Sequence, residues 1–175
     1  MVKVCQALIF KMETIKMIVS VIYRPPDASS ASFESCMNYI NSYIAGKDDY
    51  ESCIVGDFNL PSVDWSSSTV IPGCTQLERI AADKTFQFME ENLHCQFIFE
   101  PTRGSNTLDL FMTNSSNLVS HVSVSDTPLS DHSLVEVFLS HNPCQPIEPK
   151  PPDFNTSSFR SLDFTKVNFE ELNSA

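Results

Sequence analysis

The sequence is organised around Cys53-Ile54-Val55-Gly56-Asp57-Phe58-Asn59-Leu60-Pro61, which has the pattern of a buried strand ending on polar residues. Its first half is apolar and β-branched, as a central strand prefers, and Gly56 lets the backbone pass close to another element. Because side chains alternate along a strand, we expect Asp57 and Asn59 on one face. A carboxylate and an amide there suit a metal ion, a water or a phosphate. A simple turn is the alternative, since Asp and Asn are common turn residues.

Length and composition predict one domain, with an appendage at most, in the 175 residues. Hydrophobic residues make up 42% of the chain, which is enough for a sizeable core. No apolar run approaches the ~20 residues that cross a bilayer, and the first residues lack the pattern of a signal peptide. The six cysteines are widely spread without a Cys-x-x-Cys pair, so we expect buried reduced thiols in an intracellular protein.

The charge balance is acidic, with a net charge of −11 and a pI near 4.6. This argues against tight non-specific binding to nucleic acid, because such binding depends on Lys and Arg neutralising phosphates. An enzyme that acts on nucleic acid remains compatible with it, since a bound divalent cation inverts the local field.

Hydrophobic periodicity predicts alternating strands and helices. We expect strands over 4–10, 16–23, 93–99, 107–112, 119–124 and 134–139, besides the strand that ends at 57. A helix capped by Ser30 or Ser32 is expected to bury Phe33, Cys36, Met37, Ile40, Tyr43 and Ile44. A second helix, 75–92, is expected to bury Leu77, Ile80, Ala81, Phe88 and Met89. Trp65 lies in a loop, where it forms either a lid or, more commonly, a plug.

Further polar residues stand at or near strand ends. Asp109 lies inside an apolar run, where a carboxylate is unfavourable unless it is paired. It belongs either to a structural ion pair or to a site in which a histidine is its partner. Ser130-Asp131-His132 places three polar groups together before a strand, and Tyr23 ends another strand. The alternative for Tyr23 is a half-buried aromatic with its hydroxyl in water.

These residues fall into four motifs: Tyr-Arg-Pro-Pro (23–26), Gly-Asp-Phe-Asn-Leu-Pro (56–61), Pro-Thr-Arg (101–103) followed by Leu-Asp-Leu (108–110), and Ser-Asp-His-Ser (130–133). Their order resembles the endonuclease/exonuclease/phosphatase superfamily. The chain is most similar to the apurinic-type endonuclease domain of LINE-like non-long-terminal-repeat retrotransposons. The resemblance covers 1–140 and implies an α/β (α+β) fold, the DNase I-like four-layer αββα sandwich. A proline-rich linker (141–158) and the start of a connector segment (159–175) are expected to follow.

The resemblance also implies roles for individual residues. Asp57 would activate the attacking water or protonate the leaving oxygen. Asn59 would hold the nucleophile or a phosphate oxygen, and Tyr23 would donate a hydrogen bond to the scissile phosphate. His132 would stabilise the developing phosphate charge, with Asp109 fixing its tautomer and orientation.

The remaining implied roles concern the metal and the substrate. Asp131 would bind or orient Mg²⁺ (or Mn²⁺), Ser130 would support its loop, and Arg103 would bind substrate. DNA would be the substrate, which places the protein in the nucleus, with no small-molecule cofactor and no membrane partner.

One feature departs from the family pattern. The family has an upstream half-sandwich with an asparagine and the main metal-binding glutamate, whereas 22 residues precede Tyr23 here. Glu13 is the one glutamate among them, in an expected hairpin turn, and it is not assigned that role. We therefore expect the C-terminal part of the domain. The predicted function is Mg²⁺-dependent nicking of DNA by a retrotransposon-derived endonuclease. The alternatives are an inactive remnant or interaction module, and a phosphomonoesterase of the same superfamily.

Overall fold

The computed structural model describes residues 3–140; the predicted linker (141–158) and connector (159–175) lie outside them. The elements are β1 (Gln6–Met12), β2 (Met17–Tyr23), α1 (Ser30–Ile44), β3 (Glu51–Asp57), β4 (Val63–Asp64), β5 (Thr69–Val70), α2 (Gln76–Glu91), β6 (Cys95–Gln96), β7 (Asp109–Thr113), a 3₁₀ turn (Ser116–Leu118), β8 (Val119–Ser125) and β9 (Leu134–Leu139).

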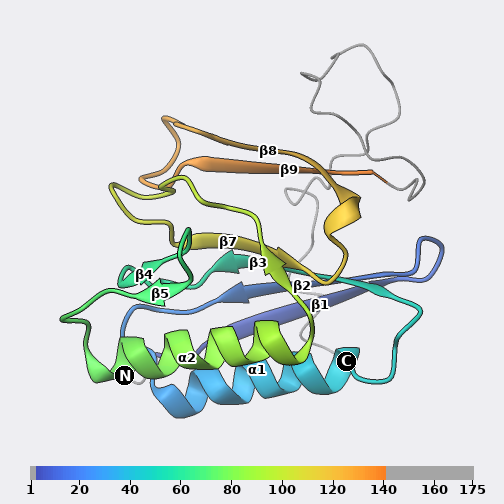
Figure 1. Cartoon of the computed structure of the whole chain (residues 1–175), viewed down its shortest axis with the longest axis horizontal. Helices are drawn as coiled ribbons and strands as arrows, with labels where there is room; N and C mark the ends of the chain where they lie inside the picture. The colour runs from blue at the N-terminus through green and yellow to red at the C-terminus, as the bar shows by residue number, and fades with distance from the viewer. Residues whose placement is uncertain (1–2, 141–175) are drawn as a thin grey trace.

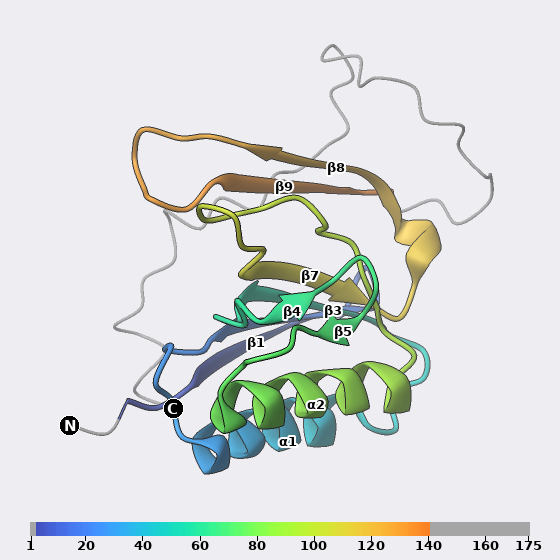
Figure 2. The same ribbon diagram turned by 60° about the vertical axis from the view of Figure 1, so that its left-hand side comes forward.

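The described elements stack in three layers (Figures 1 and 2). A five-stranded sheet in the order β1-β2-β3-β7-β6 forms the middle layer. Its strands pair antiparallel except β2 and β3, which are parallel. Helices α1 and α2 cover one face, and the antiparallel β8–β9 hairpin lies over the other. The fold is therefore mixed α/β, as predicted, and the described residues form the helical layer and the two facing sheets of the expected sandwich.

Two apolar cores lie on opposite faces of the middle sheet. The helix-side core includes Ile22, Phe33, Ile40, Ile54, Phe58, Phe88 and Met112. The core beneath β8–β9 includes Met17, Val19, Cys53, Ile98, Phe111 and Leu118. Alternation along each strand sends successive side chains into one core and then the other. The face of the middle sheet opposite the helices is thus covered in part by β8–β9.

Helix α1 begins one residue earlier than predicted. Its N-cap is Ser29, which is extended (φ −65°, ψ 149°) and whose hydroxyl accepts from the Ser32 N–H. The prediction of Ser30 or Ser32 as the cap was wrong, because Ser30 is already helical. The predicted stripe is buried at Phe33, Cys36, Met37 and Ile40, whereas its last two members are only partly buried.

Helix α2 matches its predicted range closely. Thr75 caps it through a capping box with Glu78, in which each side chain binds the other's backbone N–H. The helix buries Ala81 and Phe88 as predicted. Leu77 was predicted to be buried but is 49% exposed, because it lies in the first turn, before the buried positions begin.

The strand predicted over 93–99 was largely wrong, since only Cys95 and Gln96 form a strand there. The Gln96 side chain binds the backbone N–H and C=O of Ile98, and it thereby replaces the strand partners of that residue. A glutamine can compete with the sheet for backbone groups in this way, which the apolar pattern alone does not reveal.

Two sequence expectations about packing have clear outcomes. Trp65 is a plug: it is 4% exposed, and its Nε1–H donates to the carbonyl of Thr107 at 3.1 Å. Gly56 has φ +143°, and a Cβ there would collide with the carbonyl oxygen of Ile22, so the close backbone approach is confirmed.

The five described cysteines are free, but only Cys36 and Cys53 are buried, and Cys95 is exposed. The expectation of buried thiols was therefore correct for two of them. Within residues 3–140, no helix is both long and apolar enough to cross a membrane.

Candidate active site

Three predicted site residues form a row across the middle sheet. Tyr23 on β2 is in register with Asp57 on β3, and Asp57 is in register with Asp109 on β7. Register partners project from the same face of a sheet. The residues two positions along each strand from this row pack under β8–β9, so the row faces the hairpin. Strand pairing thus brings together residues that are 34 and 52 positions apart in the chain.

His132 reaches this row from the loop that joins β8 to β9. Its Nδ1 lies 2.7 Å from Oδ2 of Asp109, and the two side chains are 20% and 25% exposed. Because a carboxylate accepts hydrogen bonds, Nδ1 is the donor in this pair. Nε2 is then the ring nitrogen that can exchange a proton with a substrate. The prediction that Asp109 has a histidine partner is confirmed.

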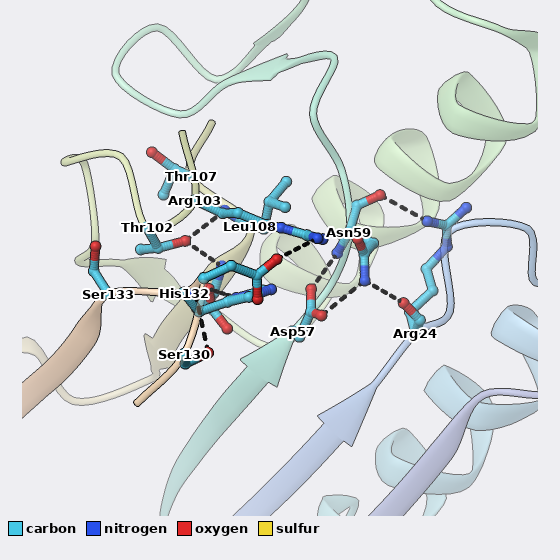
Figure 3. A network of polar contacts seen from close by, with 12 residues as sticks. Arg24, Asp57, Asn59, Thr102, Arg103, Thr107, Leu108, Ser130, His132 and Ser133 are labelled. Atoms are coloured by element: carbon cyan, nitrogen blue, oxygen red, sulfur yellow. Dashed lines mark hydrogen bonds and ion pairs between the residues drawn. The ribbon is translucent and has the colours of Figure 1, made fainter. Parts of the chain in front are cut away.

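Asp57 and Asn59 meet through a turn (Figure 3). The Asn59 backbone N–H donates to Oδ1 of Asp57 at 2.9 Å, and its Nδ2 donates to Oδ2 at 2.8 Å. The two side chains lie together as predicted, but through the turn that was the alternative and not through strand alternation. Strand β3 ends at Asp57, and Asn59 has a left-handed backbone with φ +46°. Asp and Asn side chains favour such turns by binding local backbone groups.

The environment of Asp57 disfavours its charged form. Burial raises the pKa of this carboxyl, and the negative charge of Asp109 acts in the same direction. The hydrogen bonds from Asn59 and the proximity of His132 oppose that rise. A carboxyl whose pKa is raised in this way is suited to exchanging protons.

Thr102 is a positioning residue that the sequence analysis did not single out. It is fully buried, and its Oγ1 accepts from the N–H groups of Leu108 and Asp109 at 2.9 and 3.0 Å. Its carbonyl accepts from the N–H of Ser133 at 2.7 Å. Thr102 therefore ties the start of β7 to the loop of His132. Thr102 belongs to the Pro-Thr-Arg motif, but the motif alone predicts no role for this threonine.

The other predicted residues lie at the rim. Tyr23 is 47% exposed at one end of the row. The Ser130 hydroxyl accepts from the His132 backbone N–H at 3.0 Å, which agrees with a supporting role. Arg103 and Asp131 form an exposed ion pair with 2.5 Å between Nη2 and Oδ2. The metal role of Asp131 and the substrate role of Arg103 stay predictions.

The central side chains fit a divalent cation. One potential ligand atom from each of Asp57, Asp109 and His132 lies within 4.8 Å of the others. Two carboxylates concentrate negative charge there, and a cation between them would offset both the burial that mainly raises the pKa of Asp57 and the smaller repulsion from Asp109. Carboxylate oxygens suit Mg²⁺ and Mn²⁺. Glu13 is not part of this cluster. It lies in the β1–β2 turn, at the opposite end of the sheet, where its carboxylate binds the side chains of Lys11 and Tyr50.

A paired histidine, two carboxylates and an amide therefore lie together at the edge of the stacked sheets. The family model described as endonuclease-reverse transcriptase matches residues 17–136, which is more than half of the chain. The chain belongs to this family, so the resemblance to endonucleases of LINE-like, reverse-transcriptase-associated elements is confirmed. No curated protein matches the chain.

Proposed function

We propose that the chain is a metal-dependent phosphodiesterase that nicks DNA. The observation that supports this most strongly is the convergence of Asp57, Asp109 and His132, from two strands and a loop, within 4.8 Å. Phosphodiester hydrolysis needs an activated water, stabilised phosphoryl oxygens and a proton for the leaving group. This cluster contains groups of the right chemistry for each of these tasks.

His132 and Asp109 act as a pair in this proposal. Asp109 keeps the Nδ1 proton in place, so Nε2 faces the phosphoryl group, and its charge stabilises the imidazolium that forms when Nε2 is protonated. Asp57 exchanges a proton with the attacking water or the leaving oxygen, while the two hydrogen bonds from Asn59 hold its carboxylate in one orientation. Asp57 and Asp109 would hold Mg²⁺ or Mn²⁺, and the bound ion would supply positive charge next to the phosphate.

The rim residues bind the substrate backbone in this proposal. The Tyr23 hydroxyl donates to a phosphate oxygen, and Arg103 binds a neighbouring phosphate when it exchanges Asp131 for the substrate. Asp131, once released, is free to act as a metal ligand. With a net charge of −11, the chain has few other cations for phosphate, so we expect DNA binding to be weak and sensitive to salt.

The test is nicking of supercoiled plasmid by the purified chain, with Mg²⁺ and with a chelator, beside Asp57→Ala. Asp83→Ala is the matched control, because Asp83 is an exposed carboxylate on α2, on the other side of the sheet. We expect nicking that requires Mg²⁺, is lost in Asp57→Ala and persists in Asp83→Ala. Absence of nicking by the folded wild-type chain would support the inactive remnant instead. Phosphate release from a phosphomonoester without nicking would support the phosphomonoesterase.

A further inference from the structure

Arg24 is a buried arginine whose burial is not explained by an ion pair. Its side chain is 1% exposed, and burial lowers the pKa of its guanidinium. No carboxylate within residues 3–140 forms a salt bridge with it, and its Nε has no hydrogen-bond partner there. One face of the guanidinium lies 5.6 Å from the centre of the Phe33 ring. The charges of Glu78 and Asp57 favour the guanidinium without forming a direct ion pair, and a buried charge without a direct partner is unfavourable for folding, so its other contacts need an explanation.

Those other contacts all involve the turn that follows β3. Nη1 of Arg24 donates to the carbonyl oxygens of Asn59 and Phe58 at 2.9 and 3.3 Å. Its backbone N–H donates to the carbonyl of Asp57 at 2.8 Å. In return, Nδ2 of Asn59 donates to the carbonyl of Arg24 at 2.9 Å. Figure 3 shows this reciprocal arrangement beside the carboxylate of Asp57.

The turn adopts a conformation that these contacts fix. Asn59 has φ +46°, a left-handed region that asparagine tolerates better than most residues with a side chain. In this conformation both of its donors point at the two oxygens of Asp57. Arg24 binds the carbonyls of this residue and of the one before it, so it holds the peptide units that set the conformation of Asn59.

We propose that Arg24 is a positioning residue that holds the 57–59 turn, and that it acts on the Asp57 carboxylate through Asn59. The effect on catalysis rests on the proposed function, whereas the effect on the turn does not. Lysine keeps the charge but offers a single ammonium in place of the planar guanidinium fork. Arg24→Lys should therefore loosen the turn without leaving the site uncharged.

The first measurement is amide hydrogen exchange by NMR, which requires no activity. In Arg24→Lys we expect the Asn59 N–H to exchange about ten-fold faster or more, while amides in the middle of β3 keep their protection. Phe33→Leu is the matched packing control, because Phe33 packs on the same guanidinium and edge to face on Phe58 of the turn, with ring centroids 6.4 Å apart, but makes no polar contact with the turn. This control should leave the exchange of Asn59 unchanged.

The second measurement is steady-state nicking. Arg24→Lys should lower kcat by about 10- to 100-fold with KM changed by less than about three-fold, because the displaced group acts on the reaction step. Phe33→Leu should keep its kcat at a temperature where both variants are folded. If Arg24→Lys does not fold, Arg24→Gln replaces it in both experiments, since its amide can still donate to one carbonyl.

The outcomes separate this inference from the proposed function. Unchanged exchange of Asn59 in the Arg24 variant would overturn the inference, as would a loss of kcat no larger than that in Phe33→Leu. If the Asn59 N–H exchanges faster in Arg24→Lys while the wild type does not nick DNA, the role of Arg24 in the turn is supported and the proposed function is overturned.

Discussion

The two ends of β3 each lie beside a histidine, and the two histidines are held in different ways. At the start of the strand, His94 is 5% exposed; its Nδ1 binds the carbonyl of Asn92 at 2.9 Å, and its Nε2 binds the Ser52 hydroxyl at 3.2 Å. At the end of the strand, His132 belongs to a loop and pairs through Nδ1 with the carboxylate of Asp109.

The difference lies in the partners. Both ring nitrogens of His94 are occupied by uncharged groups, and burial lowers its pKa, so it is held neutral as part of the packing. His132 has one nitrogen fixed by a charge and the other left for chemistry. A cavity of about 310 Å³ borders His94 and Ser52, not the His132 cluster. In the proposed function, the carboxylate partner distinguishes His132 from His94, whereas burial and a neighbouring cavity belong to His94.

The largest expected effect is on activity and distinguishes the two histidines directly. His132→Ala should lower the nicking rate by about 10³-fold, because it removes a group that exchanges a proton with the substrate. His94→Gln should change the rate by less than about two-fold at a temperature where the variant is folded. Rates measured on supercoiled plasmid under identical Mg²⁺ check both. A comparable loss of rate in the folded His94→Gln variant would contradict the distinction.

The next effect concerns the partner of His132. Asp109→Asn should lower the nicking rate by about 10²-fold, because an amide gives no charge to stabilise the imidazolium and can hold the ring in the wrong tautomer. The matched control is Asp126→Asn, an exposed carboxylate beside the same loop. A rate in Asp109→Asn equal to that of the control would mean that the pair is structural only.

The sequence predicted the contact between Asp109 and a histidine at the end of β3, and the reason is physical. A carboxylate within an apolar run must find a partner, so Asp109 signalled its own pairing, and side chains of the right chemistry stood at successive strand ends. Arg24 and Thr102 were not assigned roles, because they act on backbone carbonyls and amides, and any residue supplies those groups. The turn at Asn59 was predicted only as the alternative to a continuing strand, because the alternating pattern and the turn composition both place Asn59 beside Asp57.

The contacts of His94 at the start of β3 could not be predicted from the sequence. One of them joins the histidine to Ser52, 42 positions away, across the connection from α2 to β6. That connection contains Leu93 in a left-handed conformation, and Gln96 in the following β6 binds the backbone of Ile98. The first feature delays the start of the predicted strand and the second ends it early, and neither belongs to the apolar pattern on which the prediction depended.

A smaller effect on stability should identify His94 as the neutral histidine. Its folded pKa lies below the unfolded value, so the unfolded chain binds the proton first as the pH falls. The stability due to neutral His94 is present above pH ~6.5 and is lost as the pH falls through the folded pKa. Its slope is at most ~1.4 kcal/mol per pH unit. Urea unfolding from pH 7.5 to 5 checks this.

The matched comparison for that experiment is the difference between the wild type and His94→Gln at each pH. The difference removes the contribution of Asp57, whose raised pKa acts in the opposite direction. At pH 7, His94→Gln should lower the free energy of unfolding by about 1–3 kcal/mol, because buried hydrogen bonds are lost. A difference that does not shrink as the pH falls would mean that His94 is not the neutral group.

The smallest effect should come from Ser52→Ala, which removes one hydroxyl from the same arrangement. Its backbone N–H keeps the bond to Asn114 Oδ1 at 2.8 Å, so only the contact with His94 Nε2 is lost. We expect the free energy of unfolding to fall by about 1 kcal/mol, with the nicking rate unchanged. A double-mutant cycle with His94→Gln should give a coupling of at least ~0.5 kcal/mol, because the two side chains are in contact. A loss of nicking in folded Ser52→Ala would show that the two ends of β3 communicate, and the distinction between a structural and a catalytic histidine would no longer hold.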